Sequence, residues 1–216
     1  MKLYNADLSP YASRVRLQLY IKGIKADILP PPGGGVHTPE FAKINPLERL
    51  PAIDDGGFML PESSAILEYI EDTHPTPSLR PTDAKDRARM RVLYNIADDY
   101  ILGALTKLFD QANPQTRDAK ITDTALTDLA KALKGLDHFL SGGKWAQGST
   151  PTIADCTLVP VLFFVGALGP FFGQGDLMAA TPKVKAYWAS VQTDAHAARV
   201  IGELGAALQE RIKQGV

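Results

Sequence analysis

Residues 2–16 read Lys-Leu-Tyr-Asn-Ala-Asp-Leu-Ser-Pro-Tyr-Ala-Ser-Arg-Val-Arg, and this stretch decides the fold of the first part of the chain. A short strand, Lys2–Asn5, is followed by Ser9 as N-cap and Pro10 at the first helical position, which predicts a helix. Residues 15–19 alternate between apolar and polar, which is also a strand pattern. The Ser-Pro start and Gly23 as a C-cap favour the helix. A strand joined to a helix in this way indicates an α/β unit.

Outward from this unit, the first 75 residues continue to alternate between short strands and helices. The sequence predicts a second strand at 26–29, a Pro/Gly-rich loop at 30–35, a hairpin around Asp55-Gly56 and a helix over 62–73. After the proline-containing segment 74–82, only helical patterns follow, over 83–110, 118–140 and 152–166 and after Pro182 and Thr193. We therefore predict two domains, an α/β domain at 1–77 and an all-helical domain at 83–216.

The composition excludes several classes of protein. The 216 residues are 45% hydrophobic and 22% charged with a net charge of −1, which is ordinary for a soluble protein and gives no electrostatic footprint for nucleic acid. The single cysteine, Cys156, excludes a disulfide framework and a CxxC metal or redox site, and it fits a cytoplasmic location. The N-terminus has no apolar run of signal-peptide length, and the uncharged stretch 156–175 is interrupted by Pro and Gly, so we expect a core helix and a loop rather than a membrane span.

The tetrapeptide Ser9-Pro10-Tyr11-Ala12 resembles the Cys-Pro-Tyr-Cys loop of glutaredoxins with both sulfurs removed. Disulfide exchange needs an attacking thiolate, so this loop cannot perform it. A Ser hydroxyl at a helix N-terminus can instead donate a hydrogen bond to a bound thiolate, which the helix dipole also favours. The sulfur would then come from a small thiol cofactor, for which we expect glutathione. The alternative is that Ser9 is only an N-cap.

Four motifs, in order along nearly the whole chain, resemble the glutathione transferases. They are Ser9-Pro10-Tyr11 with Arg14-Val15-Arg16, the segment 45–53 (Asn-Pro-Leu-Glu-Arg-Leu-Pro-Ala-Ile), the segment 61–66 (Pro-Glu-Ser-Ser-Ala-Ile) and the segment 148–155 (Gly-Ser-Thr-Pro-Thr-Ile-Ala-Asp). The resemblance implies a thioredoxin-like N-terminal domain, an all-α C-terminal domain and a soluble, cytoplasmic homodimer. It also implies attack of the glutathione thiolate on a small hydrophobic electrophile, as in detoxification.

The resemblance also assigns residues to the cofactor. Ser9 would stabilise the thiolate. The Leu50-Pro51 step is a cis-proline step in the family, and the Leu50 backbone would pair with the glutathione backbone. Glu62 and Ser63 would bind the γ-glutamyl group. Arg49, and more weakly His37, would neutralise the glycine carboxylate. For His37 an exposed loop histidine is the favoured alternative, and for Glu62 and Ser63 the alternative is plain helix capping. Arg14 either strengthens the positive field around Ser9 or is a solvated charge.

The electrophile pocket is expected between the domains, near Tyr11, Asn95, Asp98 and Leu102, with a Phe-rich segment at 163–172 as a further candidate. A Phe cluster is also typical of a core, and Asp98 or Asp99 could instead reach the γ-glutamyl amine. Thr152 and Asp155 match a structural capping box, and Cys156 beside them is expected to be an inert buried thiol.

Two other functions remain open at this point. The first is glutathione-dependent cis–trans isomerisation, as in maleylacetoacetate isomerases, whose Ser-Ser-Cys stands where this chain has Ser9-Pro10-Tyr11. The missing thiol makes conjugation the favoured activity. The second is a non-catalytic binding module, against which the retained Ser9, Glu62 and Ser63 argue.

Overall fold

The N-terminal part is built on a mixed sheet of four short strands. The structure is a computed structural model that describes residues 1–214. The strands β1 (Lys2–Tyr4), β2 (Asp27–Leu29), β3 (Ala52–Asp55) and β4 (Phe58–Pro61) lie in the order β2-β1-β3-β4. β1 and β2 are parallel and joined through a helix, whereas β3 is antiparallel to both of its neighbours. This confirms the predicted α/β unit and the hairpin around Asp55-Gly56.

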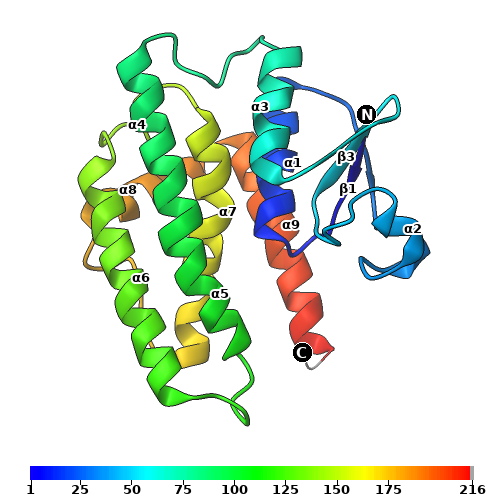
Figure 1. Cartoon of the computed structure of the whole chain (residues 1–216). Helices are drawn as coiled ribbons and strands as arrows, with labels where there is room; N and C mark the ends of the chain where they lie inside the picture. Colours follow the sequence, from blue (N-terminus) through cyan, green and yellow to red (C-terminus); the bar gives the residue numbers. More distant parts are fainter. Residues whose placement is uncertain (215–216) are drawn as a thin grey trace.

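The other regular elements of residues 1–214 are helices. They are α1 (Pro10–Lys22), a 3₁₀ turn (Pro32–Gly34), α2 (Pro39–Ala42), α3 (Ser63–Thr73), α4 (Ala84–Asn95), a π-helical turn (Ile96–Ile101), α5 (Leu102–Asp110), α6 (Ala119–Phe139), α7 (Ile153–Leu168), a second 3₁₀ turn (Gly169–Phe172), α8 (Pro182–Val191) and α9 (Ala195–Lys213). Figure 1 shows α1, α3 and α9 between the sheet and the helices α4 to α8. No helix or strand lies between Thr73 and Ala84, but the predicted boundaries 1–77 and 83–216 stay a prediction.

The segment 10–22 is a helix, so the strand alternative for residues 15–19 is wrong. Ser9 accepts a hydrogen bond from the Ala12 N–H as N-cap, and Gly23 ends the helix in the left-handed conformation. The alternating pattern misleads because α1 is buried on almost all sides. It packs on α3 and the sheet and also on α7 and α9, so polar residues such as Arg14, Arg16 and Gln18 are buried together with the apolar ones.

The long helix predicted over 83–110 contains a π-helical turn that the sequence did not reveal. Helical backbone angles continue through Asn95 and Leu102, but residues 96–101 follow the wider hydrogen-bond spacing. One extra residue in a turn rotates all later side chains by about 100° around the helix axis. This turn sets which residues of the segment face α1 and which face α6.

The uncharged stretch is a core helix, as expected. The helical stretch Ile153–Phe172, which is α7 with the 3₁₀ turn after it, is the one among residues 1–214 with the length and composition to cross a membrane, and 78% of its most apolar window is buried inside the protein. α7 contacts α1, α4 and α9, so it forms the centre on which both parts of the chain pack. Its apolar character is explained by this burial.

Candidate active site

Three of the predicted cofactor-binding segments meet at one end of the sheet. Ala52 of β3 pairs with Tyr4 of β1 on one side and with Pro61 of β4 on the other. The residues just after Tyr4, just before Ala52 and just after Pro61 therefore share this end of the sheet. Because of this strand register, the start of α1, the Leu50-Pro51 step and the start of α3 lie close together at this end of the sheet.

Ser9 can act both as a cap and as a hydrogen-bond donor. Its Oγ accepts the Ala12 N–H at 3.2 Å, which uses a lone pair of the oxygen. The hydroxyl hydrogen remains free to donate, because a Ser hydroxyl carries one donor in addition to its acceptor lone pairs. The two functions weighed for Ser9 are therefore compatible, and the N-cap is confirmed without excluding a bound thiolate.

Arg14 is a buried cation that joins α1 to the helical part, so the solvated alternative is wrong. Its side chain is 1% exposed and its Nη2 donates to Asp98 Oδ1 at 2.7 Å. Nη1 donates to the Tyr94 hydroxyl at 2.9 Å and, at 3.4 Å, to Ser63 Oγ. The guanidinium thus lies directly behind the start of α3 and adds positive charge there.

The start of α3 has no side-chain cap. Glu62 precedes the helix with φ 68°, a left-handed conformation that non-glycine residues rarely adopt and that is often found at functional sites. Its side chain makes no capping hydrogen bond, so plain capping by Glu62 is not observed. The first N–H groups of α3 remain available for an anion, with the helix dipole and Arg14 behind them.

The Leu50-Pro51 peptide is cis, as the resemblance implied. Asn45 holds the preceding loop: its Nδ2 donates to the Arg49 carbonyl at 2.7 Å and its Oδ1 accepts the Leu47 N–H. Arg49 is exposed at this edge of the site.

His37 is an exposed loop residue and does not lie free beside the site. Its side chain is 81% exposed, and Nδ1 lies 2.7 Å from Glu48 Oε2. This exposure and this contact match the favoured alternative for His37, an exposed loop histidine.

Tyr11 lies at the open side of this cluster. Its ring stacks on the Arg14 guanidinium, with 4.9 Å between Cζ and the ring centroid, and it is 39% exposed. Burial, with a smaller contribution from the Asp98 carboxylate, raises the pKa of Tyr11, while Arg14 and Arg49 act in the opposite direction. Its hydroxyl therefore stays protonated at neutral pH.

The structure does not bring the four predicted pocket residues together. Tyr11 and Asp98 meet around Arg14, but Leu102 is buried in the core cluster. Asn95 lines a different hollow, which lies on the α6 side with Asp99 and Tyr100. The prediction assumed a continuous α-helix, and the π-helical turn changes which residues face α1.

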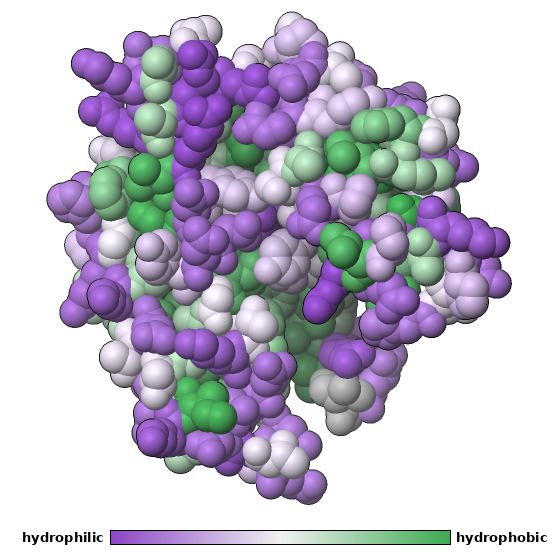
Figure 2. Space-filling view, viewed as in Figure 1, coloured by the Kyte–Doolittle hydropathy of each residue, from purple (hydrophilic) through white to green (hydrophobic). Residues whose placement is uncertain are grey.

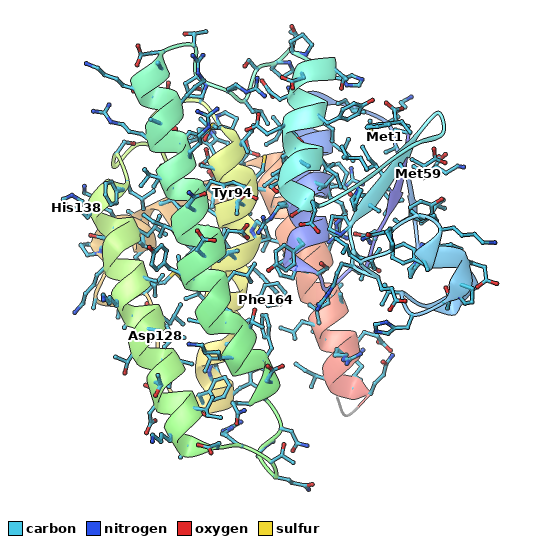
Figure 3. The ribbon with its side chains drawn as sticks, viewed as in Figure 1. Met1, Met59, Tyr94, Asp128, His138 and Phe164 are labelled. Carbon is cyan, nitrogen blue, oxygen red and sulfur yellow. The ribbon has the colours of Figure 1, made fainter. Side chains whose placement is uncertain are left out.

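A pocket of about 650 Å³ instead lies between α5, α7 and α9 and is lined by Leu8, the residue before Ser9. Its walls are Leu8, Phe109, Asp110, Ala112, Asn113, Pro114, Gln115, Phe164, Ala167, Leu168, Phe171, Leu208, Arg211 and Ile212. Figure 2 shows the recess beside the end of α9, and Figure 3 shows Phe164 between α5 and α9. Phe164 and Phe171 belong to the Phe-rich segment considered in the sequence, whereas Leu8, Phe109 and Arg211 were missed. Of these three residues only Leu8 is next to a predicted site residue, Ser9, in the sequence, and this was the one local signal that could have placed it at the pocket.

Asp155 and Cys156 are structural, as predicted. Asp155 is fully buried and accepts hydrogen bonds from Thr152, from the Ala146 N–H and from the Tyr187 hydroxyl. Burial raises the pKa of Cys156 well above its ordinary value, so the thiol is not ionised at neutral pH.

Comparison with known families gives a consistent result over most of the chain. Residues 3–78 match the model of the glutathione S-transferase N-terminal domain, and residues 96–193 match that of the C-terminal domain. A maleylpyruvate isomerase of Ralstonia is 34% identical over 174 residues, which cover 74% of this chain and 80% of the relative. The maleylacetoacetate isomerase of Mus musculus is 32% identical over 166 residues, covering 73% of this chain and 74% of the relative.

Solved structures agree with this result. The chain resembles the holo structure of a bacterial zeta-class maleylpyruvate isomerase with a TM-score of 0.73 and 29% identity, over 93% of this chain and 96% of that one. It resembles a maleylacetoacetate isomerase of Methylobacterium extorquens AM1, solved with bound malonate and glutathione, with a TM-score of 0.76 and 28% identity over 94% and 97% of the two chains.

Proposed function

The chain belongs to the glutathione S-transferase family, and from this premise we propose that it is a glutathione-dependent cis–trans isomerase of maleyl-type dicarboxylates. The observation that carries the proposal is the 34% identity to a maleylpyruvate isomerase over 80% of that relative. The sequence motifs alone favoured conjugation to an electrophile. That ranking is now reversed, because the relatives include a maleylpyruvate isomerase and several maleylacetoacetate isomerases, beside two that are named glutathione S-transferases, and conjugation becomes the second candidate.

The residues at the end of the sheet fit glutathione. A γ-glutamyl carboxylate fits the open N-terminus of α3, which has no side-chain cap and has Arg14 behind it. The peptide of the cofactor fits the Leu50 backbone, for which no backbone hydrogen bond is formed among residues 1–214. The sulfur fits the free donor of the Ser9 hydroxyl at the positive end of α1.

Bound glutathione supplies the nucleophilic sulfur of the reaction. Ser9 donates a hydrogen bond that favours the ionised form of that sulfur, and the Ser9 oxygen is held in place by the Ala12 N–H. Arg14 orients Ser63 at 3.4 Å and is itself fixed by Asp98. The apolar walls of the neighbouring pocket, among them Leu8 and Phe164, exclude water from the substrate. Together these residues would bind glutathione, orient it and favour the ionised form of its sulfur, which is what isomerisation through a thiolate requires.

The test is conversion of maleylpyruvate or maleylacetoacetate to the fumaryl isomer, followed by ultraviolet absorbance with and without glutathione. We expect turnover only with glutathione, and a higher kcat/KM than for conjugation of 1-chloro-2,4-dinitrobenzene. Glutathione-dependent conjugation without any isomerisation would instead establish the second candidate. It would also indicate that isomerisation needs the thiol that Tyr11 replaces.

We propose in addition that the protein is a cytoplasmic homodimer. A hollow of about 780 Å³ lies between α4, the π-helical turn, α5 and α6, and the exposed side chains of Val92, Tyr100 and Phe139 line it. Such exposed apolar residues favour contact with a second chain. Sedimentation should give twice the mass of the 23.4 kDa chain, and Tyr100→Lys should shift the equilibrium towards the monomer.

A further inference from the structure

Arg211 is a cation in the wall of an otherwise mostly apolar pocket. It lies in the last turn of α9, and among the described lining residues it is the only one with a positive charge. Within residues 1–214 no ion pair joins Arg211 to an acid, whereas Arg199 and Lys213 of the same helix pair with Glu203 and Glu210. Arg211 is exposed to solvent, and an accessible cation that lines an apolar pocket and has no acidic partner among residues 1–214 can meet an anionic group of a ligand there.

A second cation near this pocket, Arg117, is held by contacts within the protein. Arg117 donates from Nε to the Gln111 carbonyl and from Nη2 to the Ala112 carbonyl, and it stacks on the Phe172 ring with 4.6 Å between Cζ and the centroid. Arg117 therefore holds the loop after α5, which forms one wall of the pocket. It does not line the pocket, and this leaves Arg211 as the group that can meet an anion there.

We propose that Arg211 binds a carboxylate of the substrate in this pocket, and so selects anionic substrates. The inference rests on the proposed function for the identity of the substrate, but not for the charge preference. Leu8, next to Ser9, and Arg211 line the same pocket, with the apolar side chains of Phe109, Phe164 and Leu208 beside them. A substrate with an apolar, planar reactive part and a carboxylate matches this combination of apolar side chains and one cation.

The energetics favour a guanidinium for this role. Arg can form two parallel hydrogen bonds with a carboxylate, and an apolar surrounding strengthens a charge-assisted hydrogen bond. Asp110, on the α5 side of the pocket, is also charged and would repel the same carboxylate. The anion must therefore lie on the α9 side, against Arg211.

A purely structural role for Arg211 is the competing explanation. A basic residue in the last turn of a helix is stabilising by itself, because it interacts with the negative end of the helix dipole. Lys213 has the same position relative to the dipole but does not line the pocket. It is therefore the matched control for every variant of Arg211.

The experiment compares two glutathione conjugates and two electrophiles that differ mainly in a carboxylate. Calorimetry measures the Kd of S-(2,4-dinitrophenyl)glutathione and S-(4-carboxy-2-nitrophenyl)glutathione, and kinetics measures kcat/KM for 1-chloro-2,4-dinitrobenzene and 4-chloro-3-nitrobenzoate. Arg211→Gln should weaken binding of the carboxylated conjugate by about ten- to a hundred-fold and leave the neutral one within about two-fold. Arg211→Lys should retain most of the preference, and Lys213→Gln should change neither Kd.

Equal losses for the neutral and the carboxylated ligand in Arg211→Gln would overturn the proposal and leave Arg211 a structural cation. The same variants with maleylpyruvate separate this result from the proposed function. Carboxylate selectivity in a protein that does not isomerise maleylpyruvate would support the Arg211 subsite and reject isomerisation. Isomerisation that survives Arg211→Gln with unchanged KM would reject the subsite alone.

Discussion

The two ends of helix α1 each bury a cation, but they satisfy it differently. At the C-terminal end, the Lys22 ammonium lies 2.7 Å from Glu71 Oε2 and donates to the carbonyls of His74 and Pro77, so it is surrounded by acceptors. At the N-terminal end, Arg14 has a long contact to Ser63, an Nε without a partner among residues 1–214, and a counter-ion, Asp98, that is 26% exposed.

We propose that this difference separates a structural cation, Lys22, from a functional one, Arg14. Glu71 also accepts the Leu79 N–H and the Ser78 hydroxyl, so the Lys22 end fixes the segment that connects the sheet domain to the helices. Buried polar groups in proteins are normally satisfied. Glu71 Oε2 makes no regular hydrogen bond among residues 1–214 but lies 2.7 Å from the Lys22 ammonium, whereas Arg14 Nε has no partner and its guanidinium lies beside the uncapped start of α3. We therefore expect substitutions at the Lys22 end to change stability and those at the Ser9–Arg14 end to change activity.

The largest effect should come from Lys22→Met. The substitution leaves the Glu71 carboxylate, 3% exposed, without its counter-ion, and breaking a buried pair in this way costs about 3–5 kcal/mol. Urea denaturation should show this loss in the free energy of unfolding, while the glutathione affinity of the folded protein stays unchanged. Lys25→Met, at an exposed position of the same region, should stay within about 0.5 kcal/mol. A full loss of stability in the control, or none in Lys22→Met, would break the comparison.

The next effect should come from Ser9→Ala, at the other end of the helix. Loss of one hydrogen bond to a charged sulfur costs about 1.5–3 kcal/mol, so the rate at pH 7 should fall about ten- to a hundred-fold. Loss of the Ala12 cap should lower the free energy of unfolding by only about 0.5–2 kcal/mol. Part of the rate should return at high pH, where the bound thiol ionises without help. Tyr11 does not supply this ionisation, because burial raises its pKa and its hydroxyl stays protonated at pH 7.

The measurement is thiolate absorbance of bound glutathione against pH, with wild type, Ser9→Ala and Ser9→Thr side by side. Thr retains both the hydroxyl and the capping oxygen, so it should titrate like wild type. Identical titrations for wild type and Ser9→Ala would leave Ser9 as an N-cap only.

The sequence was sufficient where the determining contacts are local. Ser9, Gly23 and the Asp55-Gly56 turn act within a few residues of themselves, and each of the predicted elements is present. It was insufficient where packing joins distant segments. The burial of Arg14 depends on Asp98, 84 positions away, and the direction of Asp98 depends on a π-helical turn without a sequence pattern. The pocket residues Leu8, Phe109 and Arg211 come from three separate segments, so no motif could group them.

The smallest effect, and the sharpest test of the comparison, comes from exchanging the two cations by Arg14→Lys and Lys22→Arg. Lys keeps the charge at position 14 but cannot hold Asp98, Tyr94 and Ser63 with one planar fork, so the longest hydrogen bond, 3.4 Å to Ser63 and worth about 0.5–1.5 kcal/mol, is lost. Since water reaches Asp98, we expect this loss mainly as a rise in the Kd of glutathione by about two- to ten-fold in calorimetry. Lys22→Arg should do the opposite, because the larger group does not fit a fully buried site: the Cm in urea should fall while Kd is retained. A lower Cm with unchanged Kd for Arg14→Lys would show that Arg14, like Lys22, only holds the two parts of the chain together.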